Sequence, residues 1–135
     1  SDYGTLTLVV ADGPGLQVRT PQGAWEDVPY VPGAIQVNIG DMLERWTNDL
    51  WVSTQHRVLV PVEPRERARR RHSIAFFQMA NYDVVIEPLP NTVSATRPAK
   101  YAPITAGEDF MEKTSRQYSK AGERVTDVRV RSGQA

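Results

Sequence analysis

Short apolar runs separated by glycine and proline cover most of this chain. Residues 5–10 are apolar or β-branched and stop at an Asp-Gly-Pro-Gly sequence, which predicts a strand followed by a turn. Two shorter runs at 16–19 and 25–28 flank a Pro-Gln-Gly turn and predict a hairpin. Apolar and polar residues alternate from 35 to 39, so we expect the apolar face of that strand to lie in the core.

The middle of the chain is predicted to hold one helical turn and three further strands. Residues 41–46 are typical of a short helix, with Asp41 as its cap. Apolar and aromatic runs predict strands at 51–60, 73–79 and 82–89. Because only an Ala-Asn pair separates the last two runs, we expect those strands to form a hairpin.

The last third of the chain is irregular until a single helix begins. Prolines interrupt residues 91–103, and Thr105 with Glu108 then forms a capping box that predicts a helix. Seven or so short strands, one late helix and no alternation of strands with helices favour an antiparallel sandwich or jelly roll.

Composition and charge exclude several classes of protein. A chain of 135 residues is expected to form one domain. Its 16 basic and 16 acidic residues leave no net charge that would attract a polyanion or a membrane surface. Cysteine is absent, so any metal must be held by His, Asp or Glu. No run is long enough to span a membrane and the first residues lack a signal-peptide pattern, so we expect a cytoplasmic protein.

The segment 65–71 contains five arginines, a pattern that some nucleic-acid-binding loops share. Acidic residues dilute the run, no aromatic residue is interleaved for base stacking, and the whole chain is neutral. A solvated loop therefore explains the segment better than a nucleic-acid site. Only Arg71, at the start of the next strand, stands apart.

Period-two alternation places several chemically capable side chains on shared strand faces. His56 lies among apolar residues in the strand at 51–60, while Arg71, Ser73 and Phe77 share one face of the next strand. Taken singly, His56 is better explained as a core histidine and Arg71 as part of a solvated loop. If both faces point inward, they share a cavity and, together with Asp2, form a candidate metal and carboxylate site.

Six motifs in this order resemble the iron(II)- and 2-oxoglutarate-dependent oxygenases, in the branch that contains isopenicillin N synthase. Each motif alone is moderately specific, and their order over about 110 residues gives the resemblance its strength. The matching segments are 1–8 (the family's His-x-Asp segment), 15–18 (Gly-Leu-Gln-Val), 32–41 (the central strand), 53–58 (the second iron histidine), 71–73 (Arg-x-Ser) and 105–108 (the start of the closing helix).

The resemblance implies a mainly β fold, the double-stranded β-helix or jelly roll, incomplete at its N-terminal side and followed by one C-terminal α-helix. It divides the chain into a partial jelly-roll oxygenase core at 1–104, a helix at 105–120 and a flexible tail at 121–135.

The resemblance also implies roles for individual residues. Asp2 and His56 would be metal ligands for Fe(II), because a triad of two histidines and one carboxylate leaves positions open for the co-substrate and dioxygen. Arg71 and Ser73 would bind the distal carboxylate of 2-oxoglutarate, through a guanidinium fork and a hydroxyl. Phe77 would contact the substrate, although a core phenylalanine explains it about equally well. The implied reaction hydroxylates or desaturates a small organic substrate and decarboxylates 2-oxoglutarate to succinate.

One family feature is missing from the sequence. The first iron histidine would stand immediately before Ser1, so we expect residues 1–135 alone to be inactive. Two alternatives stay open: a non-catalytic jelly-roll binding module, and an isopenicillin N synthase-like oxidase that uses no 2-oxoglutarate. The expected partners are a small-molecule substrate and dioxygen, with no nucleic acid and no membrane, and the oligomeric state is left open.

Overall fold

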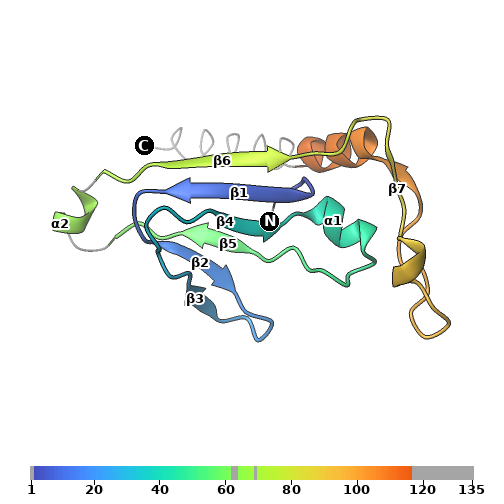
Figure 1. Cartoon of the computed structure of the whole chain (residues 1–135), viewed down its shortest axis with the longest axis horizontal. Helices are drawn as coiled ribbons and strands as arrows, with labels where there is room; N and C mark the ends of the chain where they lie inside the picture. The colour runs from blue at the N-terminus through green and yellow to red at the C-terminus, as the bar shows by residue number, and fades with distance from the viewer. Residues whose placement is uncertain (1, 62–63, 69, 117–135) are drawn as a thin grey trace, which may run out of the picture.

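The computed structural model describes residues 2–61, 64–68 and 70–116, and these form a mainly β structure (Figure 1). Strands supply most of the regular elements, as the sequence predicted. The strands are β1 (Leu6–Ala11), β2 (Leu16–Arg19), β3 (Trp25–Asp27), β4 (Gln36–Ile39), β5 (His56–Val58), β6 (Ser73–Gln78), β7 (Val85–Ile86) and β8 (Ile104–Thr105). The short helices are α1 (Asp41–Trp46), α2 (Pro64–Arg67) and the 3₁₀ turn η1 (Pro90–Thr92), and a further helix covers residues 106–116.

Three sheets organise these strands, all with antiparallel pairing. One sheet has the order β4-β1-β6, so β1 is its central strand. A second has the order β3-β2-β5, in which β2 and β3 form the predicted hairpin. The third consists only of β7 and β8. The first two sheets carry the residues of the candidate site.

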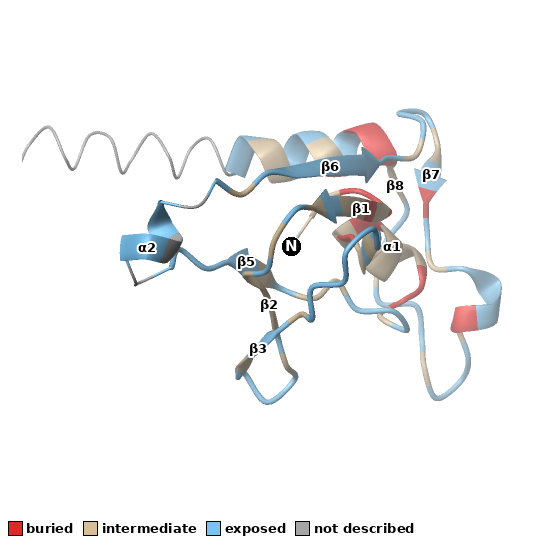
Figure 2. Ribbon diagram, turned by 60° about the vertical axis from the view of Figure 1, so that its left-hand side comes forward, coloured by how far each residue is buried: buried red, intermediate tan, exposed pale blue. Residues whose placement is uncertain are grey.

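The buried hydrophobic core lies at one end of the molecule, where α1, β7 and the start of the helix at 106–116 meet (Figure 2). Its centre consists of Met42, Ile86 and Ala106, and Trp46 and Ile104 are among the side chains packed against it. This core anchors α1, the element that follows β4. The end of β4 that adjoins α1 is therefore held in place.

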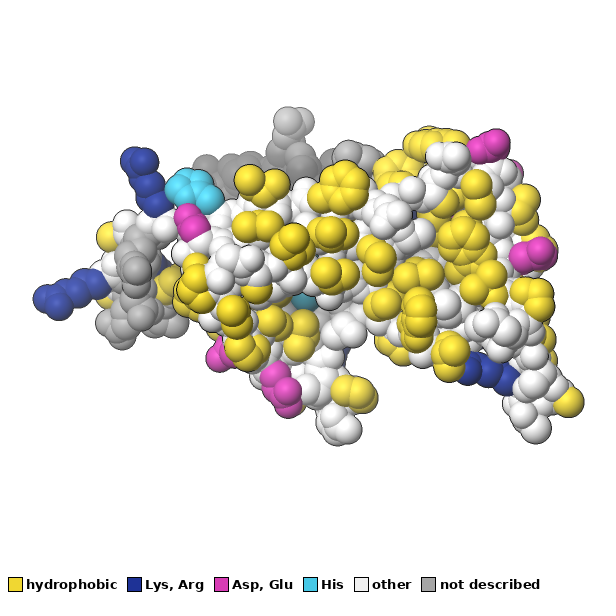
Figure 3. Space-filling view, viewed as in Figure 1, with side chains coloured by type: hydrophobic (Ala, Val, Ile, Leu, Met, Phe, Trp, Pro, Cys, Tyr) yellow, Lys and Arg dark blue, Asp and Glu magenta, His cyan; other side chains and the backbone are white. Residues whose placement is uncertain are grey.

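The sheet β4-β1-β6 turns its apolar side chains toward solvent. Val37 of β4 and Phe76 of β6 both lie opposite Leu8 of β1, so the three share one face. Val37 is 59% exposed, Phe76 63% and Ile74 76%, and hydrophobic side chains cover this side of the molecule (Figure 3). The expectation that the apolar face of residues 35–39 is core is therefore wrong for these residues. The polar side chains of the same strand face the site instead.

Two predicted strands are shorter than expected. The run at 51–60 forms a strand only at β5, because the amides of Trp51 and Ser53 donate to Thr47 and Glu44 instead of to a strand. Gln55 is already bonded to β2, since its carbonyl accepts from the Arg19 amide at 2.8 Å. The run at 82–89 forms only β7, which pairs with β8 rather than with β6, so the predicted hairpin is wrong. β6 pairs with β1 instead.

The two predicted helix caps differ in outcome. The capping box is confirmed: the Thr105 amide donates to Glu108 Oε2 at 3.0 Å, and the Glu108 amide donates to Thr105 Oγ1 at 3.2 Å. Asp41 is not a cap, because Gly40 occupies the N-cap position of α1 and Asp41 is the first helical residue. The predicted end of the late helix and the tail at 121–135 lie outside the described residues. No helix in the described part of the chain is long and apolar enough to cross a membrane.

Candidate active site

The carboxylate of Asp2 and the imidazole of His56 meet between the two larger sheets. Asp2 precedes β1 of one sheet, whereas His56 opens β5 of the other. Asp2 Oδ1 lies 3.5 Å from His56 Nε2, and the two side chains are only 14% and 26% exposed. An oxygen and a nitrogen donor that are 54 positions apart in the sequence thus converge at one partly enclosed point.

The orientation of the His56 ring follows from its second nitrogen. His56 Nδ1 lies 3.2 Å from the carbonyl oxygen of Thr54. A carbonyl oxygen can only accept, so this hydrogen bond assigns the proton to Nδ1. The lone pair then sits on Nε2, the atom that faces Asp2, and a neutral imidazole in this state is a metal ligand.

The second oxygen of Asp2 is occupied by two side chains. Thr7 Oγ1 donates to Asp2 Oδ2 at 2.6 Å and Asn38 Nδ2 donates to the same oxygen at 2.8 Å. Burial on its own raises the pKa of Asp2, but the hydrogen bonds from Thr7 and Asn38 lower it, and the pKa lies below its ordinary value. The carboxylate is therefore held in the ionised form that a metal requires.

A close backbone crossing fixes where Asp2 lies. The amide of Asp41 donates to the carbonyl of Asp2 at 2.7 Å, and the amide of Met42 donates to the carbonyl of Gly4 at 3.1 Å. A Cβ atom at Gly40 would overlap the carbonyl oxygen of Gly4, so only glycine allows the two backbones to lie this close. The N-terminal segment is consequently attached to the start of α1.

The approach to β5 is held by α1. Glu44 Oε2 accepts a hydrogen bond from the Ser53 amide at 2.5 Å, and Thr47 Oγ1 accepts one from the Trp51 amide at 3.2 Å. Both donors lie a few residues before His56. Their hydrogen bonds replace the sheet pairing that this stretch lacks and lead the chain to β5.

Arg71 lies at the turn that joins the two larger sheets. Its Nε donates to the carbonyl oxygens of Gly13 at 3.3 Å and Pro14 at 2.8 Å. Its two terminal nitrogens make no hydrogen bond within residues 2–61, 64–68 and 70–116, so this edge of the guanidinium remains available to a carboxylate. The side chain is thus anchored through one nitrogen.

Ser73 and Phe77 lie on the sheet face that bears Thr7. Ser73 is opposite Ala11 and Phe77 is opposite Thr7 in the register of β1 with β6, and residues two apart on β1 share a face. We call this face, defined by Thr7, Asn38, Ser73 and Phe77, the site face. The structure therefore brings both predicted residues to the side of the sheet on which Asp2 is bound. Their binding roles stay predictions.

The metal-binding set is limited to two side chains in the part of the chain that the structure describes. No group of three or more His, Cys, Asp or Glu residues there could hold a metal ion. The carboxylate and imidazole present match the oxygen and nitrogen ligands of a two-histidine, one-carboxylate iron site, as far as two ligands can. Asp2 and His56 therefore fit Fe(II) as part of a ligand set.

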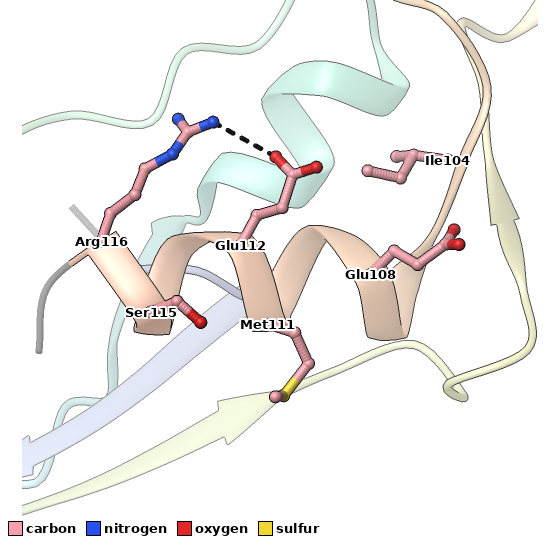
Figure 4. A pocket seen from close by; sticks show the side chains of 6 residues that line it. All are labelled: Ile104, Glu108, Met111, Glu112, Ser115 and Arg116. Carbon is pink, nitrogen blue, oxygen red and sulfur yellow. Dashed lines mark hydrogen bonds and ion pairs between the residues drawn. The ribbon is translucent and has the colours of Figure 1, made fainter. Parts of the chain in front are cut away.

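A separate hollow beside the helix at 106–116 contains none of these residues (Figure 4). It is lined by Glu112 and Arg116, which pair with each other, and by Met111 and three neighbours. Glu108 Oε2, at the same surface, is also occupied, because it accepts hydrogen bonds from Thr105. The convergence of Asp2 with His56 is the better candidate site.

Sequence reasoning missed three residues that shape the site: Thr7, Asn38 and Glu44. Thr7 and Asn38 occupy polar positions in otherwise apolar strands, and that alternation was available as a signal. Glu44 gave no such signal, because its partner is a backbone amide whose position depends on the fold.

Known proteins match this chain in sequence. Residues 1–80 match the sequence model of the 2OG-Fe(II) oxygenase superfamily. A 2-oxoglutarate-Fe(II) type oxidoreductase of Emericella nidulans is 41% identical over 119 residues, covering 87% of this chain and 32% of the relative. A homoarginine-6-hydroxylase of Oryza sativa subsp. japonica is 38% identical over 116 residues, covering 84% of this chain and 34% of the relative. The chain spans about a third of the length of these curated relatives.

Solved structures share the fold. The full-length T7H of Neurospora crassa in complex with alpha-KG has a TM-score of 0.77 and 35% identity, and covers 87% of this chain and 36% of its own. The rice dioxygenase for auxin oxidation has a TM-score of 0.77 and 28% identity, and covers 87% of this chain and 39% of its own. These similarities confirm the predicted jelly-roll class. With its first 80 residues matching the family's sequence model, the chain belongs to the 2OG-Fe(II) oxygenase superfamily.

Proposed function

We propose that this protein is an Fe(II)- and 2-oxoglutarate-dependent dioxygenase that hydroxylates or desaturates a small organic substrate. The observation that carries the proposal is the 3.5 Å approach of Asp2 Oδ1 to His56 Nε2. Both atoms are suited to bind a metal, since the carboxylate is held ionised and the imidazole presents its lone pair. Family membership adds the class of reaction.

Each residue of the site has a part in this function. Bound Fe(II) supplies the redox chemistry that links dioxygen and 2-oxoglutarate to substrate oxidation, with carbon dioxide and succinate as products. Asp2 and His56 would hold the ion, and the family resemblance implies that a histidine two positions before Asp2 would be the third ligand. Arg71 binds the distal carboxylate of 2-oxoglutarate through its terminal nitrogens, while the Gly13 and Pro14 carbonyls hold its Nε.

Ser73 and Phe77 complete the site face. Ser73 adds a hydroxyl donor to the same carboxylate, from the strand that begins two residues after Arg71. Phe77, opposite Thr7, offers an aromatic surface to the substrate.

Succinate formation by the full-length protein tests the proposal. With Fe(II), ascorbate and 2-oxoglutarate, we expect succinate to form, and we expect Asp2→Ala and His56→Ala each to abolish it. Arg71→Lys retains the charge but loses the fork, so the KM for 2-oxoglutarate should rise at least about tenfold. Turnover that survives both ligand substitutions would reject the proposal.

Residues 1–135 provide a second comparison. Without the third ligand, we expect this chain alone to bind Fe(II) poorly and to form little or no succinate. Calorimetry with Mn(II), a redox-silent substitute, should show binding by the full-length protein and a much weaker response from residues 1–135. Failure of the full-length protein to bind Mn(II) would favour a non-catalytic jelly-roll module.

A further inference from the structure

The two oxygens of Asp2 have different surroundings. Oδ2 accepts hydrogen bonds from Thr7 Oγ1 and Asn38 Nδ2, at 2.6 and 2.8 Å. Oδ1 faces His56 Nε2 at 3.5 Å. One carboxylate oxygen is thus hydrogen-bonded within the protein. The other is directed toward His56, the second predicted metal ligand.

The two donors are fixed by the sheet. Thr7 and Asn38 lie directly opposite each other in the pairing of β1 with β4, and Thr7 is only 2% exposed. A threonine side chain is stiff because its Cβ is branched. The Asn38 amide must turn its nitrogen toward Asp2, since a carboxylate only accepts. The sheet therefore fixes the backbone from which both donors extend, and Asn38 Nδ2 also donates to the carbonyl of Ile39 at 3.3 Å.

The backbone of Asp2 is held from the same side. The Asp41 amide, one residue after Gly40, donates to the Asp2 carbonyl at 2.7 Å. With its carbonyl and its Oδ2 both bound, Asp2 has little freedom to rotate about its side-chain bonds. Rotation of the carboxylate away from this orientation would break both side-chain hydrogen bonds.

We propose that Thr7 and Asn38 are positioning residues that make Asp2 a one-oxygen ligand, bound to the metal through Oδ1 alone. A carboxylate with both oxygens free can occupy two coordination positions. Holding Oδ2 on two donors preserves that second position for the co-substrate or dioxygen. This inference rests on the proposed function, because it concerns how the same metal site is kept open.

The variants that test it remove one donor at a time from the full-length protein. Thr7→Val deletes the hydroxyl at nearly constant shape, and Asn38→Ala deletes the amide. Each should weaken Mn(II) binding by about 10- to 100-fold, as loss of a hydrogen bond to a metal ligand typically does. Thr7→Ser keeps the hydroxyl and should restore binding close to that of the natural protein.

Asn81→Ala is the matched control. Asn81 is an exposed asparagine outside the site face, and its side chain makes no hydrogen bond within the described residues. We expect this variant to bind Mn(II) as the natural protein does. Thermal unfolding of every variant separates weaker metal binding from loss of fold.

Absorption spectra with Co(II) report the coordination geometry directly and require no turnover. We expect the ligand-field bands to change in Thr7→Val and Asn38→Ala and to stay unchanged in Thr7→Ser and Asn81→Ala. If Asp2→Ala abolishes Mn(II) binding while Thr7→Val and Asn38→Ala bind it normally with unaltered Co(II) spectra, the positioning inference is wrong and the proposed function stands. If Asp2→Ala binds Mn(II) normally, both are wrong.

Discussion

Glu44 Oε2 accepts a hydrogen bond of 2.5 Å from the backbone amide of Ser53. The two residues are nine positions apart, and the bond links α1 to the stretch that leads into β5. In a sheet, the carbonyl of a neighbouring strand would accept a hydrogen bond from such an amide. Here the Glu44 carboxylate accepts it. The position of His56 therefore depends on a side chain outside the sheets.

Replacement of Glu44 should loosen the approach to His56. Glu44→Ala leaves the Ser53 amide without its charged acceptor, and we expect the free energy of unfolding to fall by about 1.5–3 kcal/mol. Glu44→Gln keeps an acceptor oxygen and should lose less. Urea unfolding measures both, and Mn(II) calorimetry should show weaker binding in Glu44→Ala. Glu112→Ala, which breaks only a surface pair with Arg116, should cost under about 1 kcal/mol.

Gly40→Ala should disturb both stability and metal binding. The added methyl group meets the backbone carbonyl of Gly4, which cannot move as a side-chain tip would. We expect a loss of about 1–3 kcal/mol in the free energy of unfolding, together with displacement of Asp2. Gly13→Ala is the control, since the nearest atom to its Cβ is a side-chain carbon of Arg71 at 3.8 Å. Equal stability of the two variants would contradict the close crossing.

Asn48 is expected to combine two kinds of stabilisation. It is 3% exposed and has a φ of 52°, a left-handed conformation that costs most side chains energy. Its side chain donates to the carbonyl of Pro98 at 3.1 Å and accepts from the amide of Lys100 at 2.9 Å. Asn48→Ala should lower the free energy of unfolding by about 1–3 kcal/mol.

Asn48→Gly separates these two contributions. Glycine loses the same hydrogen bonds but adopts the left-handed conformation without strain, so it should be about 1 kcal/mol more stable than the alanine variant. Chemical denaturation at matched conditions measures the difference. An alanine variant as stable as the natural protein would show that these bonds contribute nothing.

Asp49 should make stability depend on acidity. Burial raises the pKa of Asp49, but hydrogen bonds from Lys100 and Tyr101 outweigh it and lower the pKa below the ordinary value of 3.8. A depressed pKa in the folded state gives stabilisation that is complete above the unfolded value and is lost as the pH falls through the folded value. The loss should therefore appear at acidic pH.

Asp49→Asn should flatten this acid dependence. Unfolding free energies measured between about pH 5 and pH 2 should fall less steeply in the variant than in the natural protein. Asp83→Asn changes an exposed carboxylate that has no hydrogen bond in the described part of the chain, so it should keep the natural profile. Parallel profiles for all three proteins would contradict the contribution of Asp49.

The early strands could be predicted from sequence because their signals are local. Glycine- and proline-rich turns bound β1, β2 and β3, and the hairpin of the last two follows from a short turn. The capping box could also be predicted, because its two partners, Thr105 and Glu108, are only three positions apart. Local sequence is therefore sufficient to predict these elements, without knowledge of tertiary contacts.

The pairing of distant segments could not be predicted in the same way. β7 pairs with β8 because the chain beside it is tied to the start of the late helix: the Ala106 amide donates to the Val84 carbonyl at 2.8 Å. The run at 82–89, which contains β7, follows β6 closely in the sequence, and this proximity was the sole basis for predicting a hairpin with β6. In the structure, Ile86 of β7 is buried in the hydrophobic core, and β7 pairs with β8 rather than with β6.

The side chains that hold the candidate site residues could not be predicted from sequence, and the binding roles of those residues stay predictions. Asp2 and His56 came from a family resemblance, and the structure adds that their donor atoms lie 3.5 Å apart. The polar face of β4 was assigned away from the core by alternation, and nothing local indicated that Asn38 on this face binds Asp2. Such hydrogen bonds depend on strand register, which the sequence does not specify alone.

The edge position of β6 has a consequence for hydrogen exchange. β6 pairs with β1 along one side and has no strand neighbour on the other among the described residues, and all six of its side chains are exposed. Amide protons that point toward β1 are protected by ladder bonds, whereas those that alternate with them point outward. Exchange rates along residues 73–78 should therefore alternate between slow and fast with a period of two, a pattern that the central strand β1 should not show.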